Sequence, residues 1–247
     1  MKIDRVIISS TNHKNYIDFW PIVSKSWKKL EINPTLIYTS DNDVSFDNDE
    51  EVIPLVVDEV DPIFVAQNIR LLAPALFPNE VCILSDIDII PLSKNYFFKH
   101  IKEFNDNDFV IYRPDACPPQ MLALCYNVGL GSTWGEMFDV SNKKEIKDLI
   151  KEWYPDDYVP FKKNWYFDQI ILRKQVDLFK EKHPSRVKIL NDDITKFNRL
   201  NRDNLKKDMK KYLSDQENYS DFHMPRPFSY YQRKIEKIYE KAFYGNN

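Results

Sequence analysis

The sequence predicts an α/β protein with a mainly parallel, open sheet flanked by helices and followed by a C-terminal extension of helices and loops. Short apolar runs alternate with longer amphipathic stretches, as expected of strands and the helices that cover them. Several of these runs end in small polar or acidic residues, which is typical of strands whose carboxyl ends border a ligand cleft. The stretch at 81–92 is the most informative, because its apolar residues surround Asp86-Ile87-Asp88.

The first half of the chain alternates between strand-like and helix-like segments. Strands are expected at 5–10, 35–38, 52–57 and 81–88, and helices at 16–30 and 61–77. Pro21 imposes a break or a short first turn on the first helix, whereas Asp61 caps the second. The acidic stretch 40–51 lacks the glycine of an EF-hand, so we expect a solvated connection rather than a calcium site.

The second half continues this alternation and becomes more charged beyond residue 180. Strands are expected at 108–112 and 122–130, and helices at 145–153, 165–176 and 228–244. The basic amphipathic stretch 204–213 is interpreted as a solvated face rather than a nucleic-acid site. No internal repeat or clear linker interrupts the chain, so one domain over 1–247 is expected.

Composition excludes several classes of protein. The formal net charge of −3 gives no reason to expect binding to nucleic acid or to a membrane surface. Only four glycines occur, and none forms a Walker or dinucleotide-binding loop. The three cysteines lack C-x-x-C spacing, which indicates a reducing compartment without structural zinc. Neither a signal-peptide core nor a membrane-spanning apolar run is present, so a cytoplasmic location is expected.

Asp86 and Asp88 need a compensating partner at the end of a buried strand, since carboxylates are rarely buried without one. Residues at i and i+2 of an extended backbone point to the same face. The pair is therefore suited to one hard cation such as Mg²⁺, Ca²⁺ or Mn²⁺. Alternatively, the two aspartates open a turn and cap the next segment of the chain.

Four further segments carry chemically useful side chains. Arg70 precedes the acidic strand. It is expected to pair with Asp86, to contact a phosphate, or to keep its guanidinium in water while its aliphatic carbons pack against the fold. The glycine cluster after Asn127 forms either a ligand-contacting backbone or a simple turn. Asp168-Gln169 lies among aromatic residues that could stack on a sugar, or Asp168 caps a helix. His223 is a candidate nitrogen ligand or a polar surface residue.

In this order the segments resemble the GT-A glycosyltransferases, in particular the retaining group of glycogenin and the lipopolysaccharide galactosyl- and glucosyltransferases. The resemblance covers roughly residues 5 to 230. It lies in Arg70 before an Asp-x-Asp motif, Asn127-Val128-Gly129, Asp168-Gln169 and a late loop with His223. It implies a nucleotide-binding half at about 1–115, and an acceptor-side half with the C-terminal extension at about 116–247.

The resemblance also implies roles for individual residues. Asp86, Asp88 and His223 would bind a divalent cation, Mn²⁺ or else Mg²⁺. Donor contacts would come from Ser9, Ser10, Thr11, Asn12, Tyr16, Arg70, Ser85, Asp86, Ile87 and Arg226. Asn127, Gly129 and Asp168 would face the sugar and acceptor, and Asp168 and Gln169 would be the catalytic pair.

The implied function is metal-dependent transfer of a hexose from a nucleotide-diphosphate sugar, most simply a UDP-sugar, to a hydroxyl of a glycan, lipid-linked or protein acceptor, with retention. The first strand ends in Ser-Ser-Thr-Asn, where the family usually has an acidic residue, and the late loop at 223–227 lacks the family's usual glycine and lysine. These departures leave the base open, and also the choice between retention and inversion. The alternatives are a sugar nucleotidyltransferase, disfavoured by the missing glycine-rich loop, and an inactive protein that binds sugars or nucleotides on the same fold.

Overall fold

The computed structural model describes residues 1–40, 51–214 and 218–245, so most of the acidic stretch predicted to be a solvated connection lies outside the described residues. The strands are β1 (Arg5–Ser10), β2 (Asn33–Tyr38), β3 (Glu51–Pro54), β4 (Val81–Leu84), β5 (Ile89–Pro91), β6 (Phe109–Tyr112), β7 (Asn127–Leu130), β8 (Val187–Leu190), β9 (Arg199–Asn201) and β10 (Asp221–His223). The helices are α1 (Trp20–Lys29), α2 (Pro62–Leu72), α3 (Lys94–Phe98), α4 (Gly131–Phe138), α5 (Lys143–Trp153), α6 (Phe167–Lys182), α7 (Asp192–Thr195), α8 (Leu205–Ser214) and α9 (Phe228–Tyr244).

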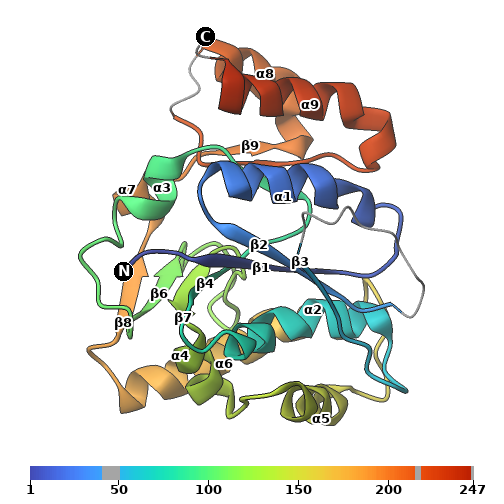
Figure 1. Ribbon diagram of the computed structural model, residues 1–247, viewed down its shortest axis with the longest axis vertical. Coiled ribbons are helices and arrows are strands. Elements are labelled where there is room, and N and C mark those ends of the chain that lie inside the picture. The colour runs from blue at the N-terminus through green and yellow to red at the C-terminus, as the bar shows by residue number, and fades with distance from the viewer. Residues whose placement is uncertain (41–50, 215–217, 246–247) are drawn as a thin grey trace.

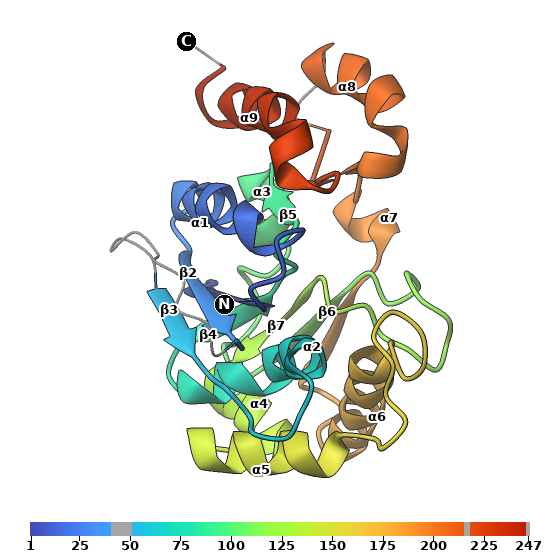
Figure 2. The same cartoon turned by 90° about the vertical axis from the view of Figure 1, so that its right-hand side faces the viewer.

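A seven-stranded sheet in the order β3-β2-β1-β4-β7-β6-β8 forms the centre of the fold. All neighbouring strands are parallel except β7, which is antiparallel to both β4 and β6. Helix α1 covers one face, and α2, α4 and α6 cover the other (Figure 1). Helices α8 and α9 lie beyond α1, and α5 lies beyond α2 and α4 (Figure 2). The predicted α/β class, with its mainly parallel sheet, is confirmed.

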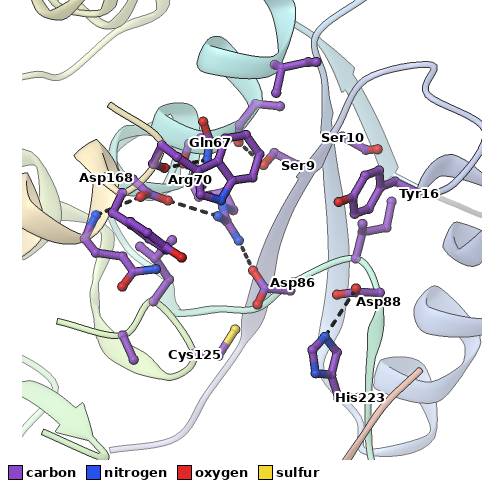
Figure 3. Close-up of a pocket in the computed structure, with 18 of the residues that line it drawn as sticks. Ser9, Ser10, Tyr16, Gln67, Arg70, Asp86, Asp88, Cys125, Asp168 and His223 are labelled. Carbon is purple, nitrogen blue, oxygen red and sulfur yellow. Dashed lines mark hydrogen bonds and ion pairs between the residues drawn. The ribbon is translucent and has the colours of Figure 1, made fainter. Parts of the chain in front are cut away.

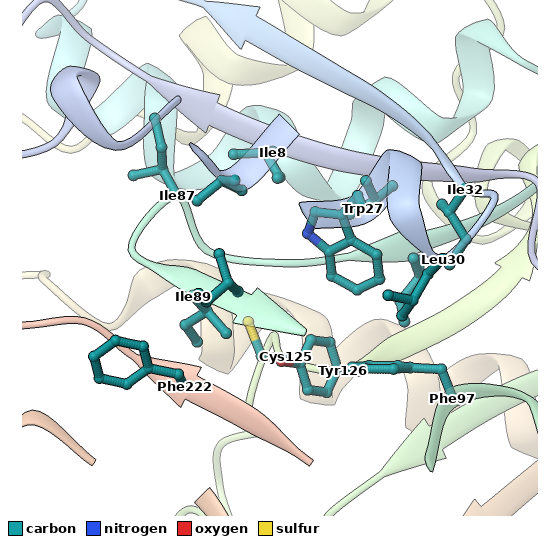
Figure 4. Packing of buried hydrophobic residues seen from close by; sticks show 14 of the residues in the cluster. Ile8, Trp27, Leu30, Ile32, Ile87, Ile89, Phe97, Cys125, Tyr126 and Phe222 are labelled. Carbon is teal, nitrogen blue, oxygen red and sulfur yellow. The ribbon is translucent and has the colours of Figure 1, made fainter. Parts of the chain in front are cut away.

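β1 shows why the central strands are apolar without alternation. Ile8 belongs to the hydrophobic cluster on the α1 side of the sheet, whereas Ile7 belongs to the cluster on the opposite side. A parallel strand covered by helices on both faces buries every side chain, so a continuous apolar run is required. In the cluster that contains Ile8, the rings of Trp27, Phe97 and Tyr126 pack edge to face (Figure 4).

A second sheet of three short strands, in the order β5-β10-β9, was not predicted from the sequence. β10 pairs antiparallel with β5, which begins directly after the acidic triplet, and His223 lies opposite Ile89. The Met224 amide also donates a hydrogen bond of 2.8 Å to the Asp88 carbonyl. This sheet therefore fixes residues from the end of the chain beside Asp88, although strands of three residues leave no periodic signal in the sequence.

Three predicted elements have different bounds. The strand expected at 52–57 ends at Pro54, and the helix expected at 165–176 runs from Phe167 to Lys182. Of the strand expected at 122–130, only the last four residues form a strand, β7. The side-chain amide of Asn127 donates hydrogen bonds of 2.7 and 2.9 Å to the backbone carbonyls of Ala123 and Leu124. These local bonds compete with a ladder and keep the preceding residues in a loop. Among the described helices, none is long and apolar enough to span a bilayer.

Candidate active site

A cavity of about 610 Å³ opens at the carboxyl ends of β1 and β4. This is the edge at which parallel α/β sheets bind ligands. Twelve of the predicted site residues line it, namely Ser9, Ser10, Thr11, Tyr16, Arg70, Asp86, Ile87, Asp88, Asp168, Gln169, His223 and Arg226. They come from β1, α2, the turn after β4, α6 and the segment around β10, so the fold gathers residues separated by more than two hundred positions.

The acidic triplet forms a turn, which corrects the extended conformation expected for it. β4 ends at Leu84, and the Ile89 amide donates a 3.2 Å hydrogen bond to the Asp86 carbonyl. The two carboxylates consequently diverge: Asp86 points toward Arg70 and Asp88 toward His223 (Figure 3). A turn allows this because the i and i+2 side chains share a face only in an extended strand.

At one end of the cavity, Arg70 lies between two carboxylates. Its guanidinium forms an ion pair with Asp86 and places Nη2 3.3 Å from Asp168 Oδ2. Asp168 is only 3% exposed, and its Oδ1 accepts a 2.8 Å hydrogen bond from the Gln169 amide. Burial raises the pKa of Asp168 to about 6, and Arg70 only partly offsets this. Burial acts in the same direction on Asp86, but Arg70 and other partners outweigh it and lower its pKa.

At the other end of the cavity, Asp88 is surrounded by two arginines and a histidine. Asp88 Oδ2 lies 3.0 Å from Arg202 Nη1, 3.3 Å from His223 Nε2 and 3.6 Å from Arg226 Nε. Arg226 also donates a hydrogen bond to the Tyr16 hydroxyl, and its guanidinium carbon lies 4.8 Å from the centre of the Tyr16 ring. One carboxylate therefore serves three basic groups, which leaves positive charge free to meet an anion.

The β1 edge supplies the polar wall between these ends. The Ser9 hydroxyl donates to the Ala66 carbonyl of α2, and the Ser10 hydroxyl donates a 2.9 Å bond to the Thr11 carbonyl. His13 also lines the cavity, with its ring centre 5.6 Å from that of Tyr16. Burial raises the pKa of Tyr16, so this phenol stays protonated and able to donate near neutral pH.

Four predicted site residues do not line the cavity. Asn12 is exposed, and Ser85 is fully buried. Asn127 is fully buried in β7 and uses its amide to hold the preceding loop. A side chain at Gly129 would come within 2.9 Å of the Phe109 ring, so this glycine permits close packing inside the fold. Asn127 and Gly129 therefore do not line the cavity themselves, although the Asn127 side chain holds Ala123 and Leu124, which do.

Sequence reasoning missed several residues that the structure brings to the cavity. Arg202 is the most informative, because it contacts Asp88 directly. Arg113 and Arg199 also line the cavity but are paired with Asp192 and with the buried Asp221. Arg202 follows the three-residue strand β9, and nothing in its sequence neighbourhood distinguishes it from the other basic residues nearby. Only the pairing of β9 with β10 brings it beside Asp88.

The side chains fit a divalent cation only in part. Asp88 and His223 offer an oxygen and a nitrogen 3.3 Å apart, whereas Asp86 is turned toward Arg70. Within residues 1–40, 51–214 and 218–245, no group of three or more His, Cys, Asp or Glu side chains is arranged to hold a metal ion. Two protein ligands suit a Mg²⁺ or Mn²⁺ ion that takes its remaining ligands from phosphate oxygens and water.

The sheet order, the turn after β4 and the cleft beside it define the GT-A glycosyltransferase fold. The structure is similar to the galactosyltransferase LgtC solved with donor and acceptor sugar analogues, with a TM-score of 0.50 and 12% identity over 96% of this chain and 95% of that one. It is also similar to the apo form of the glycosyltransferase GlyE of Streptococcus pneumoniae TIGR4, with a TM-score of 0.50 and 12% identity over 98% of this chain and 63% of that one.

A third similar structure is a glycosyltransferase involved in glycosylation of the major capsid of PBCV-1, with a TM-score of 0.47 and 14% identity over 93% of this chain and 99% of that one. No protein-family pattern matches the sequence, and no curated protein matches it either. The similarity to LgtC and to GlyE confirms the predicted GT-A fold.

Proposed function

We propose that this protein is a glycosyltransferase that moves a hexose from a UDP-sugar to a hydroxyl of a glycan, lipid-linked or protein acceptor, with retention of configuration. One observation carries the proposal. A single cavity at the carboxyl edge of a GT-A sheet has a cationic end around Asp88 and an acidic end around Asp86 and Asp168. A nucleotide-diphosphate sugar has matching parts, with an anionic diphosphate joined to a hydroxyl-rich hexose.

The Asp88 end is suited to the diphosphate. Breaking the sugar–phosphate bond develops negative charge on the leaving group, and fixed cations stabilise that charge without proton transfer. Arg202 and Arg226 supply fixed positive charge there, and both lie within 3.6 Å of Asp88. A Mn²⁺ or Mg²⁺ ion held by Asp88 and His223 would add Lewis-acid stabilisation of the same oxygens.

The β1 edge is suited to the nucleoside. Ser10, Thr11 and Tyr16 border the cavity next to Arg226, and therefore next to the proposed diphosphate position. The hydroxyl of Tyr16 and the backbone of the Ser10–Thr11 segment can bond to ribose or base, and the Tyr16 ring offers an aromatic face. No carboxylate lies on this edge among the residues that line the cavity, so recognition of the base would use neutral groups.

The Arg70 end is suited to the hexose, and its charge pattern favours retention. An inverting enzyme needs a general base that can accept the proton of the acceptor hydroxyl. Asp86, Asp88 and Asp168 are the carboxylates that line the cavity within the described residues, and each contacts a cationic group. Asp168, whose pKa burial raises to about 6, would be the general base if the reaction inverted. Gln169 would lie beside the anomeric carbon, where its amide can orient a sugar hydroxyl.

Calorimetric titration of UDP and GDP, with and without Mn²⁺, tests the donor site. Asp88→Asn should abolish the Mn²⁺-dependent part of UDP binding, because it removes the charge that holds His223, Arg202 and the cation together. Asp156→Ala, which removes an exposed carboxylate outside the cavity, is the matched control and should bind UDP as wild type does. The donor-site proposal is wrong if neither nucleotide binds wild-type protein under any metal condition.

Incubation with individual UDP-hexoses then tests transfer and stereochemistry. Slow hydrolysis should release the hexose, and proton NMR read before mutarotation should show the same anomer as the donor. Binding of UDP without turnover of any UDP-hexose, with or without sugar acceptors, would instead indicate a protein that only binds nucleotides. Release of the opposite anomer would contradict retention while leaving the donor site intact.

A further inference from the structure

Exposed apolar side chains gather in one short segment beside the cavity. Of nine large hydrophobic residues that are exposed in the described part of the chain, four lie between positions 159 and 170. They are Val159, Phe161, Tyr166 and Ile170. Scattered single residues of this kind need no explanation, but a cluster next to a cleft marks an interaction surface. Phe161 and Tyr166 also line the cavity, together with the half-buried Trp165, so the cluster continues into the proposed donor site.

Phe161 and Trp165 form a stacked aromatic pair on this surface. Their ring centres are 4.4 Å apart and their planes are inclined by 31°, so each ring covers one face of the other and keeps its second face outward. Phe161 remains 52% exposed in that arrangement. Three of the other tryptophans in the chain, Trp20, Trp27 and Trp134, are fully buried in the core. The exposed ring of Phe161, stacked on the half-buried Trp165, is therefore aromatic surface that the packing of the core does not use.

The backbone holds Phe161 in this exposed position at a cost. Its φ is 63°, which lies in the left-handed region that disfavours a bulky side chain. Two side chains of the loop contact Asp157: Lys163 forms an ion pair with it, and the side-chain amide of Asn164 donates a 2.7 Å hydrogen bond to it. In addition, the backbone amide of Val159 donates a 3.2 Å hydrogen bond to the Lys163 carbonyl. Strain that surrounding contacts maintain in this way is typical of ligand-binding positions.

The loop is also tied to the helix that carries Arg70. Gln67 of α2 donates a 2.9 Å hydrogen bond to the Trp165 carbonyl and accepts a 2.8 Å bond from the Tyr158 hydroxyl. Tyr158 is itself buried against Phe64 of α2, with ring centres 5.0 Å apart. The aromatic pair therefore has a fixed position relative to Arg70 and Asp168, at the sugar end of the cavity.

We propose that Phe161 and Trp165 form the platform that binds the carbohydrate part of the acceptor. This inference rests on the proposed function, because it takes the cavity to be the donor site. A sugar ring has an apolar C–H face that packs on an aromatic face, and hydroxyls that bond to polar groups at its rim. Gln169 and Gln67, which line the same cavity, supply amide groups that fit that mixed chemistry better than they fit a lipid chain.

Saturation-transfer NMR tests the platform directly. The probes are the methyl α- and β-glycosides of glucose, galactose, mannose and N-acetylglucosamine, together with lactose, maltose and cellobiose, each measured with UDP and Mn²⁺ present. At least one sugar should receive saturation from wild-type protein. Phe161→Gly should weaken its binding by about tenfold, the upper range for one aromatic contact. Tyr230→Ala, which removes a 78%-exposed tyrosine of α9 outside the cavity, should leave it unchanged.

Phe161→Gly also separates binding from folding. Glycine adopts a positive φ without strain, so the melting temperature of this variant should not fall below that of Tyr230→Ala. A lower melting temperature, with sugar binding unchanged, would show that the ring has a structural role and would overturn the inference. Trp165→Phe, which keeps an aromatic face, should retain measurable sugar binding.

The outcomes distinguish this inference from the proposed function. If wild-type protein binds UDP but no sugar in the panel, or if Phe161→Gly and Tyr230→Ala bind sugar equally, the platform is wrong and the donor site stands. A surface that binds detergent micelles or peptides but no sugar would likewise overturn the platform. If UDP also fails to bind, the proposed function falls together with the platform.

Discussion

The two ends of the cavity have opposite ratios of acidic to basic side chains. At the Arg70 end, one guanidinium is shared by the carboxylates of Asp86 and Asp168. At the other end, Asp88 alone is shared by Arg202, Arg226 and His223. Both arrangements satisfy buried charge locally, but the first leaves an excess of negative charge and the second an excess of positive charge.

This difference favours one orientation of a bound donor in the cavity, with its diphosphate at the Asp88 end. A diphosphate placed at the Arg70 end would meet two carboxylates, whereas at the Asp88 end it meets two arginines. Like-charge contacts in a partly desolvated site cost several kcal/mol, which is sufficient to set orientation. Polarity of charge along the cavity, rather than a phosphate-binding loop, would therefore orient the donor.

Removal of Arg70 should have the largest effect on this comparison. Arg70→Ala leaves Asp86 and the 3%-exposed Asp168 without their shared cation, so the free energy of unfolding should fall by about 3–5 kcal/mol. Urea denaturation measures this, and adding Asp168→Asn should restore part of the loss. Lys144→Ala, which breaks an exposed pair with Asp148, is the control and should change little. A loss below about 1 kcal/mol would mean that water replaces Arg70 adequately.

Asp168 should give the Arg70 end a distinctive pH dependence. Burial raises its pKa from 3.8 to about 6, so between these values the folded protein binds more protons than the unfolded chain. Stability therefore falls as the pH rises through this interval, by roughly 2–3 kcal/mol. Asp86, whose pKa is lowered, acts oppositely and loses stabilisation as the pH falls below about 4. Urea denaturation at pH 4 to 7 measures this, and Asp168→Asn should reduce the fall in unfolding free energy with rising pH. If the variant shows the same pH dependence as wild type, another group causes it.

Arg202 gives the smallest expected effect and concerns the cationic end alone. Arg202→Ala should weaken UDP binding by about tenfold, as expected for loss of one charge-assisted contact to phosphate. Because this contact is partly exposed, the difference from wild type should narrow as the salt concentration rises. Arg233→Ala removes an exposed arginine of α9 outside the cavity and should bind UDP normally. Equal affinity of the two variants in low salt would place the diphosphate away from Arg202.

The sequence alone determined the features that depend on local pattern. The buried strands β1 and β4, the cap of α2 at Asp61 and the terminal helix α9 were predicted because apolar periodicity and capping chemistry act over a few residues. The position of Asp86-Ile87-Asp88 at the carboxyl edge of the sheet came from the same reasoning. Twelve of sixteen predicted site residues consequently line the cavity.

Only the tertiary structure decided which partner each charge has. The turn at 86–89 separates Asp86 from Asp88. The pairing of β10 with β5 and with β9 brings His223 and Arg202 beside Asp88 across more than a hundred positions. The sequence likewise did not show that the Asn127 side chain bonds to the carbonyls of the loop residues Ala123 and Leu124. Local pattern predicts where a charged side chain sits on its own element, but long-range packing selects its neighbours, and those neighbours set its chemistry.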